Sequence, residues 1–161
     1  MKKNILIIGP TSEIAKEYIN EISDKFNIHS ISRKKNFNSL IVNNIIFDQT
    51  KNLDEKKLIK LINKIKFLYV IFFASDQIAS PNVIRKIKNI KIFNALCVNS
   101  IFPIKLTYFL IEKKMINKNV KFIYFSSRAG SITERGTLKH HKSIGNHVYR
   151  ASKALLNSFV K

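Results

Sequence analysis

Short, almost purely apolar runs alternate along this chain with longer stretches of helical spacing. The runs are rich in β-branched and aromatic residues, and the stretches between them repeat apolar residues every three or four positions. Near-continuous apolar strands joined by amphipathic helices are typical of a parallel sheet covered on both faces. The pattern therefore predicts a doubly wound, Rossmann-like α/β fold. The expected strands are Ile5–Ile8, Ile28–Ser32, Ile45–Phe47, Phe67–Ala74 and Val120–Phe125.

The expected helices fill most of the spaces between these strands. Apolar residues at helical spacing run from Ile14 to Ile22, from Leu58 to Ile65 and from Phe102 to Met115. The second and third strands are too close in sequence for a full crossover helix, so we expect a short or irregular connection there. A chain of 161 residues without a Pro/Gly-rich linker or a repeat suits one domain, and we predict that residues 1–161 form a single nucleotide-binding domain.

Membrane-spanning and secretory segments are not apparent in the sequence. The longest uninterrupted apolar run, Phe67–Ala74, is far shorter than the roughly 20 residues that cross a bilayer. The run Ile5–Ile8 is shorter than the ~7–15-residue core of a secretion signal. The single cysteine, Cys97, cannot form a disulfide within the chain, as is typical of a reducing compartment. We predict a soluble cytoplasmic protein with no membrane partner.

The chain carries a formal net charge of +19. Such a charge attracts polyanions, and nucleic acid is one interpretation. However, only five of the 29 basic residues are arginine, the side chain that nucleic-acid sites commonly use. The lysines are also scattered in ones and twos, and isoleucine and asparagine are frequent, as in proteins of AT-rich genomes. We favour coding bias and predict no nucleic-acid partner.

The first expected strand ends in a turn, GPTSEIA (residues 9–15), and a helix follows at once. Gly9 permits a sharp turn, Ser12 suits the N-cap, and Glu13 suits the positive end of the helix. The free N–H groups of a helix N-terminus can bind a pyrophosphate. A plain tight turn is the alternative interpretation of the same residues.

The stretch IIGPTSEIA resembles the glycine motif of the short-chain dehydrogenase/reductase family, which is spaced G-x-x-x-G-x-G. Gly9 matches the first glycine, Glu13 stands at the second and Ala15 at the third. Alanine still permits close packing of helix on strand, whereas Glu13 brings a carboxylate near the phosphates. The resemblance implies that four residues of the turn bind a nicotinamide dinucleotide, namely Gly9, Thr11, Ser12 and Ile14.

The second strand ends at Ser32, and three cations follow it, beginning with Arg33. In dinucleotide folds an acidic residue here binds the adenosine ribose, whereas a basic residue accommodates a 2′-phosphate. Arg33 offers a planar fork and Ser32 a hydroxyl for such a phosphate. We therefore predict NADP(H) as the cofactor and NAD(H) as the second choice. A solvated basic loop is the alternative.

Two later strand ends complete the expected cofactor site. By the resemblance, Asp48 bonds the adenine amino group, although an aspartate here can equally cap the next helix. The fourth strand ends in FFASD, where the family usually has Asn-Asn-Ala-Gly. Ala74 matches that motif, Ser75 is a small substitute for its glycine, and Phe73 replaces an amide side chain. The resemblance assigns Ala74 and Ser75 to the cofactor site.

Four residues match the catalytic set of the family in order and spacing: Asn99, Ser127, Tyr149 and Lys153. The resemblance implies that Ser127 orients the substrate oxygen and that Asn99 keeps a water in place for proton relay. It also implies that Tyr149 and Lys153 bind the nicotinamide end of the cofactor. A lone Y-x-x-x-K pair also occurs between neighbours on a helix surface.

The pairing of a tyrosine with a lysine four residues later has a chemical reason. Reduction of a carbonyl leaves negative charge on its oxygen, which must take up a proton. A phenol ionises only near pH 10, which is a poor match to neutral conditions. An ammonium group one helical turn away lies on the same face and favours the phenolate, so proton transfer becomes efficient. This set predicts hydride transfer between nicotinamide and a carbonyl or alcohol substrate.

The sequence departs from the family at the loop 128–148 and at its end. The loop is unusually long and contains three histidines, but without other residues at ligand spacing we predict no metal site. Family members continue with further strands and helices after the Tyr/Lys helix, whereas this sequence stops at Lys161. We expect a C-terminally incomplete fold, either a fragment of a longer gene product or an inactive natural truncation.

Two other functions remain open at this stage. Nucleotide-sugar epimerases and dehydratases share a Tyr/Lys pair, but their first turn usually spaces glycines as G-x-x-G-x-x-G. A non-catalytic nucleotide-binding module would explain Glu13 and Phe73. Its case is weakened by the Ser127, Tyr149 and Lys153 set. Association of the chain with itself is a further possibility, because family members often pair through the helices that carry the Asn and the Tyr/Lys pair.

Overall fold

The computed structural model describes residues 2–35, 38–62, 64–75, 87–133 and 147–160. Two compact units are present. The first unit comprises Met1–Ala74 and Lys105–Phe125, and the second comprises Ser75–Ile104 and Ser126–Lys161.

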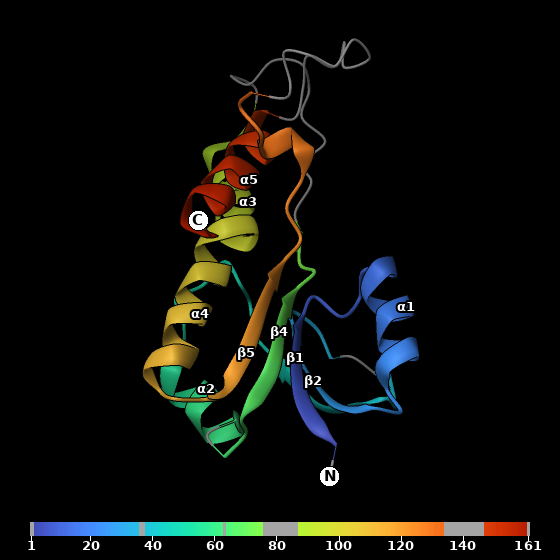
Figure 1. Ribbon diagram of the computed structural model, residues 1–161. Helices are drawn as coiled ribbons and strands as arrows, with labels where there is room; N and C mark the ends of the chain where they lie inside the picture. The colour runs from blue at the N-terminus through green and yellow to red at the C-terminus, as the bar shows by residue number, and fades with distance from the viewer. Residues whose placement is uncertain (1, 36–37, 63, 76–86, 134–146, 161) are drawn as a thin grey trace. The chain divides into compact units, whose positions relative to one another are not determined.

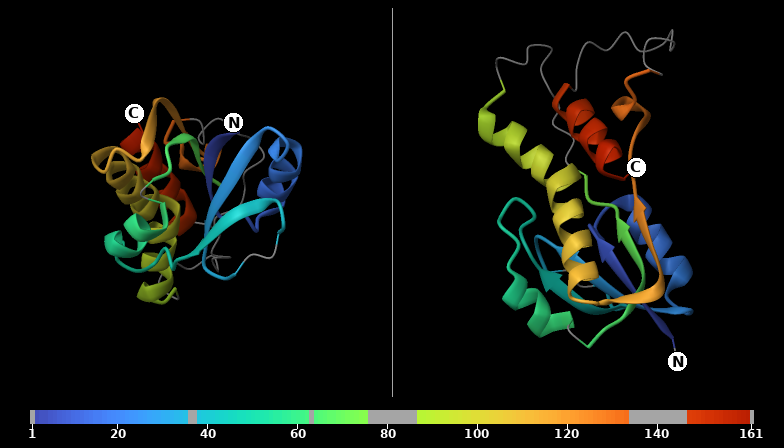
Figure 2. Two further views of the ribbon diagram at one scale, coloured as in Figure 1. Left: turned by 90° about the horizontal axis from the view of Figure 1, so that it is seen from below. Right: turned by 60° about the vertical axis from the view of Figure 1, so that its left-hand side comes forward.

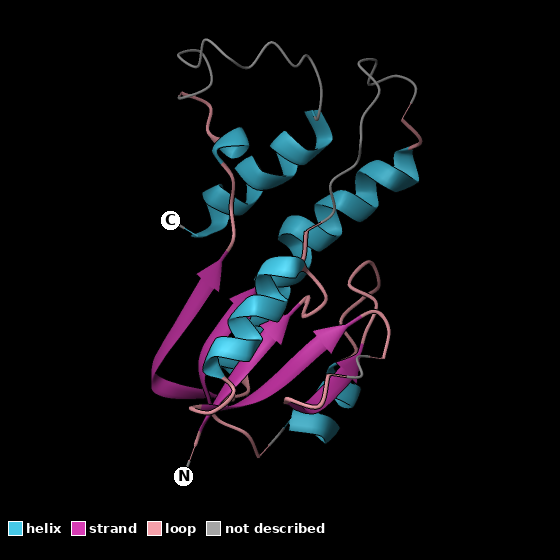
Figure 3. Cartoon of the chain, turned by 90° about the vertical axis from the view of Figure 1, so that its right-hand side faces the viewer, coloured by secondary structure: helices cyan, strands magenta, loops and turns pink. Residues whose placement is uncertain are grey.

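The first unit is built on a five-stranded parallel sheet with the order β3-β2-β1-β4-β5 (Figure 1). All strands run in one direction, so their carboxyl ends share one edge (Figure 3). This order reverses between β1 and β4, where dinucleotide folds bind their ligands. The predicted parallel sheet is confirmed. The strands are β1 (Lys3–Ile8), β2 (Phe26–Ser32), β3 (Ile41–Ile46), β4 (Phe67–Phe72) and β5 (Ile116–Tyr124).

Helices cover both faces of this sheet, as a doubly wound fold requires. Helix α1 (Glu13–Ile22) packs on one face, and α2 (Glu55–Ile62) lies on the other with the part of α4 (Phe102–Glu112) that belongs to this unit (Figures 1 and 2). Ala15 and Ile19 of α1 are fully buried. They pack on inward side chains of the sheet, namely Ile5, Ile7, Ile28, Ile71 and Phe73.

The connection between β2 and β3 is irregular, as predicted. No helix occurs there among residues 33–35 and 38–40, the part that the structure describes. The end of β2 is nevertheless fixed, because the amide of Phe47 donates to the carbonyl of Ser32 over 2.8 Å.

The second unit contains α3 (Asn89–Leu96), a π-helical turn η2 (Cys97–Ile101), a short 3-10 turn η3 (Arg128–Gly130) and α5 (His147–Val160). Helix α5 packs against each of the other three elements. Its contact with α3 is apolar and involves buried Ala95 and Val148. The unit therefore holds α5 on several sides.

The helical stretch Asn89–Glu112 has 24 residues and a mean hydropathy of 1.3 over its most apolar window. By length and composition alone it is long enough to cross a membrane. However, 56% of that window is buried inside the protein. Because the buried core helix of a soluble protein passes the same test, one such helix is weak evidence of a membrane span.

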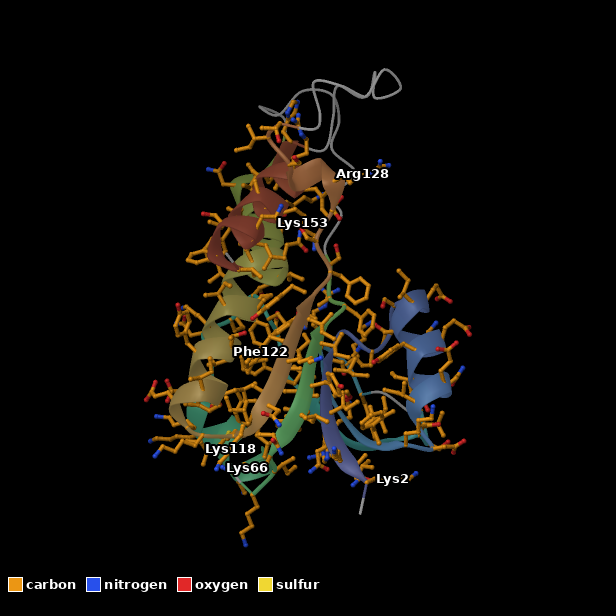
Figure 4. All side chains as sticks on the ribbon, in the orientation of Figure 1. Lys2, Lys66, Lys118, Phe122, Arg128 and Lys153 are labelled. Atoms are coloured by element: carbon orange, nitrogen blue, oxygen red, sulfur yellow. The ribbon has the colours of Figure 1, made fainter. Side chains whose placement is uncertain are left out.

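Lysines gather where the strands of the first unit begin. Lys2, Lys66 and Lys118 lie near the amino ends of β1, β4 and β5 (Figure 4). The ammonium group of Lys2 donates to the carbonyl of Ser23, the C-cap of α1, over 3.0 Å. That of Lys66 donates to the carbonyl of Lys114, just beyond α4. Cations at helix C-termini satisfy open carbonyls and oppose the helix dipole.

Candidate active site

Gly9 forms the turn between β1 and α1 in the first unit. Its φ angle of +80° is one that residues with a Cβ rarely adopt. A Cβ at this position would lie 2.6 Å from the amide nitrogen of Ala74, just after β4. Gly9 therefore lets the backbones after β1 and β4 approach each other at the point where the strand order reverses.

The predicted N-cap of α1 is confirmed. The hydroxyl of Ser12 accepts a hydrogen bond of 3.2 Å from the amide of Ala15. Glu13 lies in the first turn and forms an exposed ion pair of 2.8 Å with Lys16. Thr11 and Ile14 are exposed beside the turn. The N-terminus of α1 thus carries the Glu13 carboxylate in its first turn, and Lys16 partly neutralises the charge of that carboxylate.

Ser32 and Arg33 differ in exposure at the carboxyl end of β2. Ser32 is buried, and its hydroxyl lies 2.5 Å from the carbonyl of Lys34 and 2.9 Å from Oδ1 of Asn44. These internal acceptors make Ser32 a support of the loop that follows. Arg33 is exposed. Of the two, the guanidinium is the group that a solvent-borne phosphate can reach.

Asp48 follows β3 and is exposed. Its Oδ1 accepts hydrogen bonds from the amide of Thr50 over 3.0 Å and from the Thr50 hydroxyl over 2.8 Å. The amide bond, followed by the hydroxyl bond, holds the pKa of this carboxyl below its ordinary value. Asp48 is therefore a fixed, ionised acceptor at the edge of the sheet where β1 and β2 also end.

Tyr149 and Lys153 lie one turn apart on α5, in the second unit. The ammonium nitrogen of Lys153 is 5.7 Å from the centroid of the Tyr149 ring. Lys153 is only 2% exposed, and burial lowers the pKa of its ammonium group. Figure 4 shows Lys153 on α5 and Arg128 on η3. The structure thus places a buried cation against the tyrosine.

Asn99 is buried in the π-helical turn η2, a kind of irregularity that is frequent at functional sites. Its side-chain amide donates to the hydroxyl of Ser152 over 2.9 Å. The hydroxyl of Ser100 donates to the carbonyl of Ser152 over 2.5 Å. Ser152 lies between Tyr149 and Lys153, so η2 is bonded to α5 within the same helical turn. Sequence reasoning missed Ser152 and Ser100, although both stand beside residues it had selected.

Ser127 is the N-cap of η3 and is half-buried. Its oxygen accepts a hydrogen bond of 3.2 Å from the amide of Ala129, which leaves the hydroxyl proton for another acceptor. Gly130, at the end of η3, lies against Lys153 so closely that a Cβ would stand 2.7 Å from the Lys153 carbonyl carbon. Ser126 also donates a hydrogen bond to the side chain of Asn157 on α5.

The predicted site residues therefore fall into two groups. The first unit carries eight residues of the expected cofactor site, and the second carries exposed Ser75 and the whole expected catalytic set. The eight are Gly9, Thr11, Ser12, Ile14, Ser32, Arg33, Asp48 and Ala74, which ends the unit. Most of the 128–148 loop lies outside the described residues.

A pocket of about 280 Å³ opens between η3 and another face of α5. It is lined by Ile132, His147 and Arg150, together with small residues of η3 and α5. None of Asn99, Ser127, Tyr149 and Lys153 lines it. We therefore do not assign it to the reaction centre.

No protein-family model matches the sequence, and no curated protein is significantly similar to it. Solved structures do match. A short-chain dehydrogenase family protein from Francisella tularensis is 19% identical, covers 98% of this chain and superposes with a TM-score of 0.78. A carbonyl reductase from Pseudomonas aeruginosa in complex with NADP is 16% identical, covers 98% and gives a TM-score of 0.78.

The chain has the fold of short-chain dehydrogenase/reductase proteins. A third such structure, an oxidoreductase of this family from Brucella ovis in complex with a partially ordered NAD, is 17% identical over 98% of the chain with a TM-score of 0.77. The chain spans 61% of the Francisella protein, 73% of the Pseudomonas reductase and 74% of the Brucella protein. The match to this fold therefore covers 98% of the chain, and each of these three relatives is longer.

Proposed function

We propose that this chain belongs to an NADP(H)-dependent oxidoreductase of the short-chain family, which acts on a small carbonyl or alcohol substrate. The observation that carries the proposal is the buried ammonium of Lys153, 5.7 Å from the ring of Tyr149 in the unit that also holds Asn99 and Ser127. Burial of an ammonium group costs free energy that hydrogen bonds or charge partners must offset. The structural relatives, among them a carbonyl reductase in complex with NADP, support this chemistry.

The residues of the first unit fit a dinucleotide. The turn at Gly9 lacks a Cβ where the backbone must pass close to a pyrophosphate, and the N-terminus of α1 offers amides to it. Arg33 is exposed where the 2′-phosphate of NADP(H) would lie, and Asp48 is an ionised acceptor for the adenine amino group. Of the structural relatives described above, one is in complex with NADP and another with NAD. We choose NADP(H) because of Arg33.

The residues of the second unit supply the proton chemistry. When bound, the cofactor supplies or accepts the hydride. In reduction Tyr149 gives its phenolic proton to the substrate oxygen, and the charge of Lys153 stabilises the phenolate that remains. Ser127, whose oxygen is oriented by the Ala129 amide, donates a hydrogen bond from its hydroxyl to the same substrate oxygen and keeps its proton. Asn99 keeps a water in place, through which Tyr149 and Lys153 regain a proton after the reaction.

The remaining features of the proposal concern partners and location. We propose a cytoplasmic enzyme without a metal, and we propose no nucleic-acid or membrane partner. Self-association of the chain and the single-domain organisation of residues 1–161 stay predictions. The single cysteine and the fold, shared with oxidoreductases, favour the cytoplasmic assignment.

The test is the variant Tyr149→Phe, assayed for NADPH binding by fluorescence titration and for NADPH oxidation with a panel of aldehydes and ketones. We expect turnover to fall by at least about a hundredfold, because general acid catalysis of this kind contributes ~10²–10⁴-fold. NADPH binding should remain within about twofold. Substantial turnover by the variant would refute the mechanism, and absence of NADPH binding in the unaltered protein would refute the cofactor.

A non-catalytic nucleotide-binding protein is the second candidate. It is favoured by Glu13, whose carboxylate lies in the first turn of α1 near the expected phosphates. An epimerase-like enzyme is less well supported, since the turn follows the spacing G-x-x-x-E-x-A rather than G-x-x-G-x-x-G. NADPH binding without turnover on any carbonyl or nucleotide sugar would favour the non-catalytic module.

A further inference from the structure

We propose that Ser152 is a positioning residue for the Tyr149–Lys153 pair, because it bonds the helical turn between them to the π-helical turn that carries Asn99. The inference rests on the proposed function only in taking Tyr149 as the acid–base group. Ser152 itself need not touch substrate or cofactor.

The contacts of Ser152 involve both its side chain and its backbone. Its hydroxyl accepts a hydrogen bond of 2.9 Å from the Asn99 amide and donates one of 2.7 Å to the carbonyl of Tyr149. Its own carbonyl accepts a hydrogen bond of 2.5 Å from the hydroxyl of Ser100. Ser152, Asn99 and Ser100 are each at most 1% exposed, so water cannot replace these bonds readily.

A serine inside a helix often bonds to a carbonyl one turn back, so the contact with Tyr149 alone would be unremarkable. The two bonds from neighbouring residues of η2 are different, because they tie α5 to a second element at two points. One reaches the side chain of Ser152 and the other its backbone. Together they fix the position of α5 along its axis and its rotation about that axis at this turn.

Gly130 supports the same turn from η3. A Cβ on Gly130 would lie 2.7 Å from the carbonyl carbon of Lys153 and 2.9 Å from the amide of Ala154. The turn that begins at Tyr149 and ends at Lys153 is therefore held by η2 through hydrogen bonds and by η3 through close packing.

Among the described charged residues of α5 and of the elements packed against it, Lys153 is the most buried. The charged residues on the elements packed against α5 are Lys91 on α3 and Arg128 on η3, and both are exposed. The turn η2 contains no charged residue. On α5 the other titratable neighbours are His147 and Arg150. Because the interaction of two groups falls with distance, a local distortion of the helical turn between Tyr149 and Lys153 would weaken the effect of Lys153 on Tyr149.

The experiment follows tyrosinate formation by ultraviolet absorbance during a pH titration of the complete chain. The signal that disappears in Tyr149→Phe reports Tyr149 alone among the five tyrosines. In Ser152→Ala we expect the midpoint of this signal to move upward by about half a unit or more, which corresponds to roughly 0.7 kcal/mol. Ser158→Ala, the same change at an exposed position of α5, should leave the midpoint unchanged.

Ser152→Cys is the second variant, in case alanine prevents folding. It keeps the volume nearly constant but replaces the hydroxyl with a weak donor and acceptor, so it should shift the midpoint in the same direction. A lower melting temperature with an unchanged midpoint would mean a merely structural role and would overturn the inference. This readout needs no turnover, so a midpoint near that of free tyrosine in the unaltered protein would instead count against the proposed function.

Discussion

The ammonium nitrogen of Lys153 lies 5.7 Å from the centroid of the Tyr149 ring, and the lysine side chain is almost fully buried. Burial lowers the pKa of this ammonium group because the charged form loses its hydration. Its burial therefore costs free energy that the contacts of the side chain must offset. The contribution of Lys153 to stability can be measured separately from its role in the proposed chemistry.

Lys153→Met should test that separation. Methionine has a similar length and no charge, so we expect the variant to fold, and its melting temperature measures what the ammonium contributes to stability. Turnover of NADPH with a carbonyl substrate should fall by about a hundredfold or more, because the phenolate loses its cation. Lys91→Met, on the exposed side of α3, controls for the loss of one positive charge. A clearly destabilised Lys153→Met would show that the ammonium serves the fold.

Gly130→Ala should loosen the support of α5. The added Cβ would stand within 3 Å of backbone atoms of Lys153 and Ala154, so one of the two elements must move. We expect a loss of about 1–3 kcal/mol in the free energy of unfolding, measured by urea denaturation. Ala151→Ser adds one atom at an exposed position of the same helix and should cost far less. Equal stabilities of the two variants would contradict the close packing.

Arg33→Ala should change cofactor preference. Arg33 is exposed after β2, where the 2′-phosphate is expected, so its removal should weaken NADPH binding about tenfold or more and leave NADH binding nearly unchanged. Fluorescence titration of both cofactors measures the ratio. Lys25→Ala, before β2 at the opposite end of that strand, removes the same charge and should alter neither affinity. An unchanged ratio in Arg33→Ala would contradict the assignment of NADP(H).

Glu13→Gln should improve cofactor binding. The carboxylate lies in the first turn of α1 and is only partly neutralised by exposed Lys16. Removing it relieves repulsion of a pyrophosphate and frees the lysine, so NADPH affinity should rise about two- to fivefold at low salt. Glu17→Gln, one turn along the same helix, should have little effect. Weaker binding by Glu13→Gln would mean that the carboxylate takes part in binding.

His29 should make stability depend on pH. Its side chain is buried in β2, its Nε2 lies 3.3 Å from Oδ1 of Asn4, and burial lowers its pKa below 6.5. The unfolded chain therefore binds this proton more readily than the folded one. The contribution of neutral His29 to the free energy of unfolding is complete above about pH 6.5, the pKa of a histidine in the unfolded chain. It is lost as the pH falls from there through the lower pKa of the folded state.

Urea denaturation at pH 8 and pH 5 measures the effect, at about 1.4 kcal/mol for each unit of difference between the two states. His29→Gln, which does not titrate, should lose less stability over this range than the unaltered protein. A parallel pH dependence in both proteins would show that other groups are responsible.

The sheet could be predicted because its strands are almost entirely apolar, and a run such as Phe67–Phe72 has few alternatives to a buried strand. The start of β5 was missed because Asn117, Lys118 and Asn119 are polar and exposed, and they lie where the register with β4 shifts. The N-cap at Ser12 could be predicted from local chemistry, since the bond to Ala15 spans only three residues.

The contacts of the candidate site were harder to predict. The bond between Asn99 and Ser152 joins residues 53 positions apart, and no spacing rule links them. The burial of Ser32 depends likewise on the side chain of Asn44 in the neighbouring strand. Periodicity locates elements, whereas contacts of this kind depend on how side chains of separate elements meet.

The separation of the two groups of residues has a functional consequence. Gly9, Arg33 and Asp48 belong to one compact unit, whereas Ser127 and Ser152 belong to the other. Substitutions in the second unit can therefore abolish a reaction without removing a residue from the turn and strand ends expected to hold the nucleotide. For the proposed enzyme, loss of catalysis and loss of coenzyme binding should therefore be separable by single substitutions.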